Sequence, residues 1–447
     1  MIVPTSRLLF WFSILVLPSV TLASTLHASH PVLAACASLL VIAFTLLVCS
    51  DASAILLRQS DFKIQTPPLV RLQKDRPGVI PIRITSNSPT STTLRLGLAF
   101  PDEIISESDD IRVSLPSHTP SSQFDWTVTP NRRGQYFLQK IYLESSSPFR
   151  FWVRRSHQLA PTEIRVYPDL FAERKNVAAV FLKRGTLGTH SRRTIGQGRD
   201  FEKLREYLPG DSYDEIHWKA SAKRGHPVTK VFQVERTQEV YVVVDASRLS
   251  ARSVVTENGT TTALERSVVA SLILALAAEQ QGDLFGLVTF SDRVHSFVRA
   301  KRGQAHYNAC KDQLYTLHPQ DVTPDFEELT IFLRQNLRKR ALIIFLTALD
   351  DPVLAENFLK ASALLCRQHL LIVNMLQPPN AHPLFSTPIE EFDQIYAHLG
   401  GHLQWNSLRE LAKKFQRQGI RFAQLDPSRL PAQIIAQHAD VKQRQLL

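Results

Sequence analysis

Residues 239–247 read EVYVVVDAS, an almost unbroken run of β-branched residues that ends at an acid and a serine. Such a run is typical of a central strand in a parallel sheet, because that strand is buried on both faces. Apolar runs at 283–292, 341–351, 370–376 and 420–426 predict further strands. Helical periodicity predicts helices at 263–281, 305–317, 324–340, 353–369, 407–419 and from about Pro431. The alternation predicts an α/β domain with a doubly wound parallel sheet over residues 239–447.

The helix predicted at 263–281 is apolar almost all round and needs to be distinguished from a membrane span. Its apolar core, Val268 to Ala278, is shorter than the roughly 20 residues that a bilayer requires. We therefore expect a buried helix of the α/β domain.

Two earlier segments do have the length of membrane spans, from about Leu8 to Ala23 and from Pro31 to Cys49. Neither contains a charged residue, and the connection between them is short, so residues 1–57 are predicted to form a transmembrane helical hairpin. The first segment alone could be a cleaved signal peptide. The second long apolar stretch follows at once and favours retention of both.

Positive charges flank the hairpin and are absent from its turn. Arg7 precedes it, and the chain after it carries Arg58, Lys63, Arg71, Lys74 and Arg76. Because lysine and arginine favour the cytoplasmic side, both ends and the bulk of the chain are expected in the cytoplasm, below an inner or cytoplasmic membrane. The formal net charge of +11 agrees with basic cytoplasmic loops. The four cysteines have no metal-ligand spacing, so neither zinc nor a disulfide framework is expected.

Between the hairpin and the α/β domain the pattern changes twice. Residues 58–170 alternate apolar and polar in several short runs separated by Pro, Ser, Asn and Gly, which predicts a small β-sandwich. Residues 171–238 contain the polar stretch GRDFEKLREYLPGDSYDEIHWKASAKRG at 198–225.

This stretch predicts two short helices. Residues 200–208 place apolar side chains at helical spacing, and a turn follows at residues 209–211. Ser212 and Glu215 are spaced as a capping box for a second helix, which Gly225 would end. Capping leaves Arg205, Asp211, His217, Trp218 and Lys219 unexplained. They form either an ion-pair network that docks on the α/β domain or a surface that binds a partner.

Oxygen-bearing side chains follow three predicted strands of the α/β domain: Asp245 and Ser247, Thr323 with Asp325, and Thr347 with Asp350 and Asp351. The carboxyl ends of parallel strands meet at one sheet edge, where hydroxyl and carboxylate oxygens suit Mg²⁺. The same residue types also serve as helix caps and turn residues.

The strand ending VVVDAS, the long helix and the loop FLTALDD resemble the von Willebrand factor A fold. That resemblance implies a metal-ion-dependent adhesion site built from Asp245, Ser247, Thr323 and Asp350. The family pattern has a second serine where this chain has Leu249, and Ser250 comes one residue late. The missing hydroxyl removes one expected Mg²⁺ ligand.

The stretch at 198–225 closely resembles the signature of the domain of unknown function 58 (DUF58) family. The upstream RRGQYFL and SPFRFW also resemble family stretches, with Arg150 where the family has glycine, and the resemblance extends over essentially the whole chain. It implies a non-enzymatic adaptor that works with a MoxR-type AAA+ ATPase in assembling or maturing envelope proteins. The signature residues expected to be structural or to bind the partner are Arg205, Tyr207, Gly210, Asp211, His217, Trp218 and Lys219.

Two other classes of function remain open. The sequence has no Gly-x-Ser-x-Gly, phosphate-loop or HExxH motif, so we expect no catalysis by the chain itself, but the strand-end oxygens leave a metal-dependent hydrolase as an alternative. Basic stretches at 223–230, 334–340 and 413–419 are scattered and carry no nucleic-acid motif, so no nucleic acid is expected as a partner.

Overall fold

The computed structural model describes residues 1–26, 30–57, 62–86, 92–116, 121–171, 195–209, 211–233, 238–256, 259–379, 381–384, 386, 392–444 and 446. The chain divides into two compact units, Met1–Asp169 and Leu170–Leu447. The result is a mixed α/β protein with two apolar helical segments at its N-terminus, as predicted.

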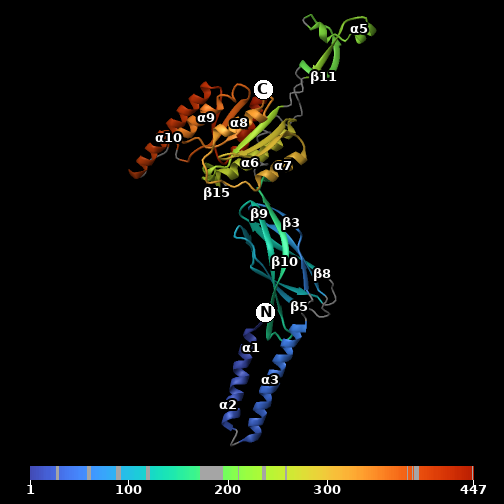
Figure 1. The fold of residues 1–447 in the computed structure, drawn as a ribbon, viewed down its shortest axis with the longest axis vertical. Helices are drawn as coiled ribbons and strands as arrows, with labels where there is room; N and C mark the ends of the chain where they lie inside the picture. Colours follow the sequence, from blue (N-terminus) through green and yellow to red (C-terminus); the bar gives the residue numbers. More distant parts are fainter. Residues whose placement is uncertain are drawn as a thin grey trace. The chain divides into compact units, whose positions relative to one another are not determined.

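The first unit begins with the helices that were predicted to be a hairpin. The first segment comprises α1 (Ser6–Trp11), a π-helical turn (Phe12–Val16) and α2 (Leu17–Leu26), and the second is α3 (Pro31–Leu57). The two segments lie side by side (Figure 1). Residues 6–25 and 31–56 are long and apolar enough to cross a membrane.

Two sheets form the rest of the first unit. One contains β1 (Ile2–Pro4), β3 (Leu69–Gln73), β5 (Thr92–Leu98), β7 (Asp110–Leu115), β9 (Gly134–Ser146) and β10 (Trp152–Tyr167). The other contains β2 (Phe62–Gln65), β4 (Gly78–Ser86), β6 (Ile104–Ser106) and β8 (Ser121–Pro130). Alternate side chains of both sheets, among them Ile82, Leu96 and Trp126, share one apolar core. Burying that shared face is what period-two alternation achieves.

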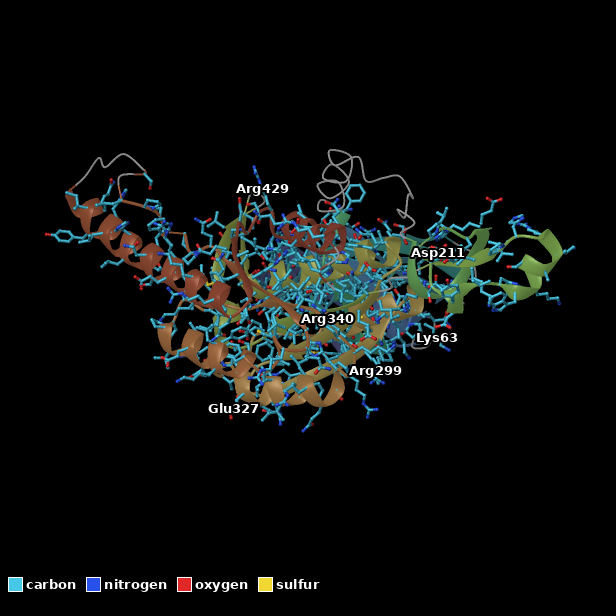
Figure 2. All side chains as sticks on the ribbon, turned by 90° about the horizontal axis from the view of Figure 1, so that it is seen from above. Lys63, Asp211, Arg299, Glu327, Arg340 and Arg429 are labelled. Carbon is cyan, nitrogen blue, oxygen red and sulfur yellow. The ribbon has the colours of Figure 1, made fainter. Side chains whose placement is uncertain are left out.

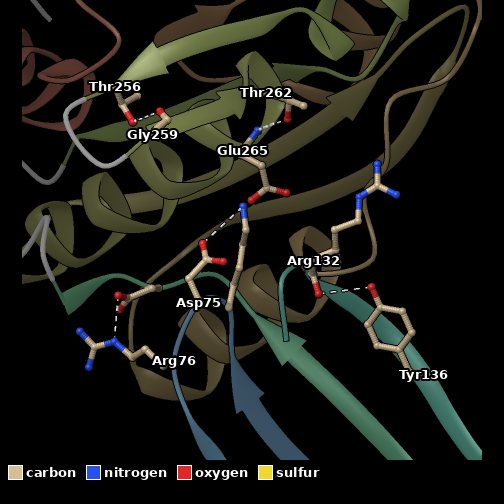
Figure 3. Close-up of polar contacts among 10 residues, drawn as sticks. Asp75, Arg76, Arg132, Tyr136, Thr256, Gly259, Thr262 and Glu265 are labelled. Atoms are coloured by element: carbon tan, nitrogen blue, oxygen red, sulfur yellow. Dashed lines mark hydrogen bonds and ion pairs between the residues drawn. The ribbon is translucent and has the colours of Figure 1, made fainter. Parts of the chain in front are cut away.

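Polar contacts fix the connections of this unit. Arg76 donates from Nε to Asp169 over 2.9 Å, and the Tyr136 hydroxyl donates to the Arg132 carbonyl over 3.2 Å (Figure 3). The first contact connects Asp169, two residues after the end of β10, to the turn after β3.

The second unit contains the predicted α/β sheet. Its strands are β13 (Glu239–Asp245), β16 (Leu284–Phe290), β17 (Val294–Lys301), β18 (Leu342–Leu346), β19 (Leu370–Leu376) and β20 (Arg421–Leu425), in the order β17-β16-β13-β18-β19-β20. All neighbouring pairs are parallel except β16 and β17. The antiparallel edge strand β17 was not predicted from the sequence.

Helices cover both faces of this sheet. The core on one face includes residues of α6 (Ala263–Gln280), α7 (Gln304–Leu314) and α11 (Leu430–Gln443). The core on the other includes residues of α8 (Phe326–Asn336), α9 (Pro352–Ser362) and α10 (Phe392–Arg417). Helix α6 is buried along most of its length, which confirms that it is a core helix.

A short hairpin, β14 (Ser253–Thr256) and β15 (Gly259–Thr262), leads into α6. The Thr256 hydroxyl donates to the Gly259 carbonyl over 2.8 Å, and the Thr262 hydroxyl caps α6 by accepting from the Glu265 N–H over 3.3 Å (Figure 3).

The prediction of a helix over residues 200–208 is wrong. Residues Ile195–Glu206 form β11, which pairs antiparallel with β12 (Val228–Gln233). The predicted capping box is also wrong, because Ser212 makes no side-chain cap and only a 3₁₀ turn, Tyr213–Glu215, follows it. The partner strand explains the first error: β12 is rich in β-branched residues, and cross-strand pairing overrides a helical pattern of this length. The helix that does form is α5 (Trp218–Arg224), ended by Gly225 at φ 75° as predicted.

Candidate functional site

The sheet of the second unit changes its direction of winding at β13. The chain adds β16 and β17 on one side of β13 and then returns to add β18, β19 and β20 on the other. In open α/β sheets, ligands bind at the carboxyl ends of the strands beside such a switch point. Asp245 is the last residue of β13 and lies there.

Asp245 is almost completely buried, with 2% of its surface exposed. One carboxylate oxygen, Oδ1, accepts from the Ser247 N–H over 2.8 Å, and Oδ2 accepts from the Thr347 hydroxyl over 2.6 Å. Burial raises the pKa of Asp245, and the hydrogen bonds from Thr347 and Ser247 oppose that rise. The site therefore holds a carboxylate that is costly to ionise.

The Ser247 side chain is also fully buried, and its hydroxyl makes no hydrogen bond among the described residues. A buried hydroxyl without a partner costs free energy, which is the usual mark of strain or of a place for a ligand. It stands two residues after Asp245, on the loop that leaves β13.

A pocket opens beside these residues. Most of its polar lining comes from three strand ends, with Ser267 of α6 added: Asp245, Ser250 and Arg252 at and after the end of β13, Thr347 after β18, and Asn374 with Gln377 at β19. Asn374 and Gln437 of α11 exchange amide hydrogen bonds of 3.0 and 2.8 Å, so this wall is fixed by the last helix. Leu249 also lines the pocket, at the position where the adhesion-site pattern has a serine.

The other two predicted ligands lie differently. Asp350 forms an ion pair with Arg252, with 2.6 Å between Oδ2 and Nη2. Thr323 is exposed, on a loop whose neighbouring Val322 carbonyl accepts from the Arg248 N–H over 3.1 Å. The structure thus brings Asp245, Ser247 and Thr347 together, with Asp350 held by an arginine and Thr323 outside the pocket lining.

Within the described part of the chain, no group of three or more His, Cys, Asp or Glu side chains could hold a metal ion. The oxygens available to Mg²⁺ are those of Asp245, the Ser247 and Thr347 hydroxyls, and the Thr323 hydroxyl on the adjoining loop. This is a sparse but chemically suitable set for a cation that keeps several waters. Magnesium binding stays a prediction.

A second polar cluster follows β16 and was missed from the sequence. The buried Ser291 hydroxyl lies 2.7 Å from Asp292 Oδ1, 2.7 Å from His295 Nε2 and 3.2 Å from Gln320 Oε1. One hydroxyl has a single proton, so Ser291 can donate to Asp292 while it accepts from His295. That hydrogen bond lowers the pKa of Asp292. In a nucleophilic triad the acid would instead orient the imidazole.

The predicted signature residues lie around the β11–β12 hairpin. Arg205 Nη2 and Asp211 Oδ1 are 2.6 Å apart, and Asp211 Oδ2 accepts from the Leu208 N–H (3.1 Å) and the Thr229 hydroxyl (3.3 Å). The hydrogen bond from Leu208, together with Arg205, lowers the pKa of Asp211. Figure 2 labels Asp211 on this hairpin. The Arg205–Asp211 ion pair therefore connects β11 to the loop that follows it, within the signature segment.

His217 begins α5. Its Nδ1 accepts from the Ala220 N–H over 3.0 Å, and its own N–H donates to the Val228 carbonyl over 2.8 Å. These contacts give it a structural role. Gly210 lies outside the described residues.

The remaining signature residues are aromatic or exposed. Tyr207 stacks on Tyr213 with 6.2 Å between ring centroids, Lys219 is exposed, and Trp218 is 70% exposed. An exposed tryptophan on a hairpin whose fold is held by other residues is free to contact a partner.

These observations define a mixed α/β protein with two N-terminal apolar helices consistent with membrane anchoring and, at a strand-end switch point, a pocket that contains the buried Asp245 carboxylate. Residues 203–383 match the model of the family described as "Protein of unknown function DUF58". The match confirms, for residues 203–383, the resemblance to the DUF58 family that the signature indicated.

Among curated proteins, the chain is similar to uncharacterized proteins of Mycobacterium bovis and of two strains of Mycobacterium tuberculosis. Each is 24% identical over 195 residues, which is 43% of this chain and 59% of the relative. The chain thus spans about three fifths of the length of the curated relatives it matches.

Among solved structures, similarity is recorded to a C. elegans MSP family member (13% identity, covering 24% of this chain and 99% of that one) and to the YadV chaperone (10% identity, 24% and 52%). Both TM-scores are 0.17.

Proposed function

We propose that the chain is a multi-pass, membrane-anchored adaptor that binds other proteins, works with a MoxR-type AAA+ ATPase in assembling or maturing envelope proteins, and performs no catalysis itself. The ATPase and the process follow from the family resemblance. The two helices at residues 6–25 and 31–56 would anchor the chain, with positive charges on their cytoplasmic side.

We further propose that the second unit is a von Willebrand factor A-like domain with a doubly wound sheet. Its strand order, counted along the chain, is 3-2-1-4-5-6, with helices on both faces. Asp245 and Ser247 after the first strand, and Thr347 after the fourth, occupy the edge at which such sheets bind ligands.

The observation that carries the proposal is the state of the Asp245 site. The Asp245 carboxylate, with 2% exposure, lines a pocket at the sheet edge. Two residues further on, the buried Ser247 hydroxyl has no hydrogen-bond partner among the described residues. Such groups are unfavourable in the isolated chain and become favourable when a ligand supplies the missing contacts. A partner's polar side chain is a suitable ligand, either directly or through Mg²⁺ held by Asp245, Ser247 and Thr323.

The test is recovery of the candidate ATPase by the full-length chain in lipid nanodiscs, with and without Mg²⁺. We expect Asp245→Ala to lose the partner and Glu327→Gln, an exposed acid of α8 (Figure 2), to retain it. Equal recovery by the Asp245 variant would contradict this site.

The alternatives predict other outcomes in the same preparation. Turnover of a small-molecule substrate that disappears in Asp245→Ala would establish the metal-dependent hydrolase. Nucleic-acid binding would appear as an affinity that falls steeply with salt.

A further inference from the structure

The turn between β9 and β10, residues Ser147–Trp152, is held by three internal hydrogen bonds. Ser147 N–H donates to the Trp152 carbonyl (2.9 Å), Arg150 N–H donates to the Ser147 carbonyl (3.0 Å), and Trp152 N–H donates to the Ser147 hydroxyl (3.0 Å). Pro148 has no N–H to satisfy. Two backbone donors of the turn, those of Phe149 and Phe151, have no partner within the turn itself.

Asp51, near the C-terminal end of α3, supplies those two partners. Its Oδ1 accepts from the Phe149 N–H over 3.1 Å, and its Oδ2 accepts from the Phe151 N–H over 3.3 Å and from the Ser147 hydroxyl over 2.5 Å. Asp51 is only 1% exposed. Every backbone N–H from residue 147 to residue 152 is therefore bonded within the protein.

Two carbonyls of the turn accept hydrogen bonds from Thr5, near the start of the chain. The Thr5 N–H donates to the Phe151 carbonyl over 2.9 Å, and the Thr5 hydroxyl lies 2.8 Å from the Arg150 carbonyl and 3.0 Å from that of Phe151. A turn surrounded by water has no need of this, because water satisfies its backbone groups. In a bilayer the protein itself must satisfy them.

The side chains of the turn continue the apolar surface of α3. Phe151 lies against Phe44 of α3 at 6.0 Å between ring centroids, and Phe149 stacks on Phe151 at 6.3 Å. The Trp152 indole N–H donates to the Val48 carbonyl of α3 over 3.1 Å. Phe149 remains 57% exposed. Figure 1 shows β10 reaching the same end of the first unit as α3.

We propose that this turn is a further membrane-contact element, with Phe149 inserted at the boundary between lipid headgroups and acyl chains beside α3. This inference rests on the membrane anchoring proposed above. Aromatic side chains favour that depth, and the closed hydrogen bonding removes the cost of bringing the backbone there. Arg150, exposed at the tip, has the length and charge to reach lipid phosphates while its neighbours are inserted.

The test measures depth in the bilayer with a nitroxide label on the full chain, in nanodiscs of phosphatidylcholine and phosphatidylglycerol. The label is placed at Phe149→Cys, at Ile105→Cys of β6 and at Leu39→Cys of α3, with the four native cysteines replaced. Phe149 and Ile105 are equally exposed, at 57%, so they are matched apart from their position. Leu39, 66% exposed on α3, reports the span itself.

We expect the ratio of oxygen to water-soluble nickel-reagent accessibility to be severalfold higher at 149 than at 105, and highest at 39. A ratio at 149 equal to that at 105, with 39 still in the bilayer, would overturn the inference and leave the anchoring intact. Aqueous values at all three positions would overturn both. Neither outcome depends on the ATPase, so the adaptor proposal stands or fails separately.

A second measurement avoids the cysteine replacements. A photoreactive benzoylphenylalanine at position 149 is expected to cross-link to phospholipid in the otherwise native chain, and the same residue at position 105 is not. Absence of lipid adducts at 149 would count against the inference even if the labelled variants fail to fold.

Discussion

Asp51 and Asp245 are both buried carboxylates, 1% and 2% exposed, yet their surroundings differ in kind. Asp51 accepts three hydrogen bonds from one turn, and each of those donors would otherwise lack a partner. Asp245 accepts two, next to a serine hydroxyl that makes none among the described residues. The first carboxylate completes the fold of its region, whereas the second is left incomplete at the edge of a pocket.

Burial alone therefore does not identify a functional acid. What matters is whether the donors around a carboxylate depend on it. Removing Asp51 orphans several groups, while removing the charge of Asp245 relieves a desolvation cost. The two should therefore respond to substitution with opposite signs.

A third buried acid, Asp283, is expected to cost the most stability when it is substituted. Asp283, at the opposite edge of the sheet from Asp245, lies 2.8 Å from Lys442 Nζ and 3.1 Å from His438 Nε2 of α11. Asp283→Ala leaves Lys442 without its counter-charge and removes the carboxylate that faces the buried His438, so it is expected to lower the free energy of unfolding by about 3–5 kcal/mol. Denaturant unfolding of the full chain in detergent measures it.

The pH dependence of this loss has a defined sign. Burial alone would raise the pKa of Asp283, but Lys442 and His438 outweigh it and lower that pKa. The stabilisation is therefore complete above the unfolded value near 3.8 and is lost as the pH falls through the lower native pKa. An Asp283→Ala penalty that vanished already at pH 6 would contradict this assignment.

Asp51→Ala is expected to cost about 3 kcal/mol, because the N–H groups of Phe149 and Phe151 and the Ser147 hydroxyl lose their acceptor. The melting temperature of the first unit in detergent should fall, with that of the second unit unchanged. Unaltered melting would show that water replaces the carboxylate and would remove the contrast with Asp245.

Asp245→Asn is expected to act in the other direction, stabilising the second unit by about 1 kcal/mol at neutral pH. Burial raises the pKa of Asp245, so this acid destabilises the fold progressively as the pH rises above the unfolded value near 3.8 and most fully above the raised native value, and the amide removes this term. The gain should shrink toward zero as the pH falls to the unfolded value. A loss of stability at pH 7 would mean that Asp245, like Asp51, is structurally required.

The smallest effect concerns Arg150, whose φ of 61° is one of two positive values among described non-glycine residues. Arg150→Gly is expected to raise stability by about 0.5–1 kcal/mol, because glycine adopts this conformation without strain. Arg150→Gln keeps the strain and removes only the charge, so it serves as the control for lipid effects. Equal melting of the two variants would contradict the strain argument.

Much of the fold was predictable from the sequence. β-branched runs such as the one ending at Asp245 correctly predicted the parallel strands. The apolar core of α6 is too short to span a membrane, which correctly predicted a buried helix. The edge strand β17 was missed because its side chains lack a clear period, and β11 was missed because apolar residues at 200–208 recur at helical spacing. Both owe their conformation to a neighbouring strand, and pairing of that kind is not encoded locally.

The candidate site was predictable only in part. Asp245 and Ser247 were identified because they directly follow a strand, whereas Asp350 turned out to be paired with Arg252, which is 98 residues away in the sequence. The Ser291 cluster carried a usable signal, since polar residues also follow β16 directly. Asp51 was overlooked because one acid after an apolar stretch resembles the end of a span. Arg150, noted in place of glycine, does adopt a left-handed backbone.

Strand β10 runs without a break in assignment from Trp152, next to the proposed lipid-facing turn, to Tyr167, with a bulge between Leu159 and Thr162. Sixteen residues of extended chain measure roughly 50 Å. The strand would thus act as a strut that holds its far end several Debye lengths from the charged headgroups. A partner arriving at that end would be insensitive to the lipid composition of the bilayer.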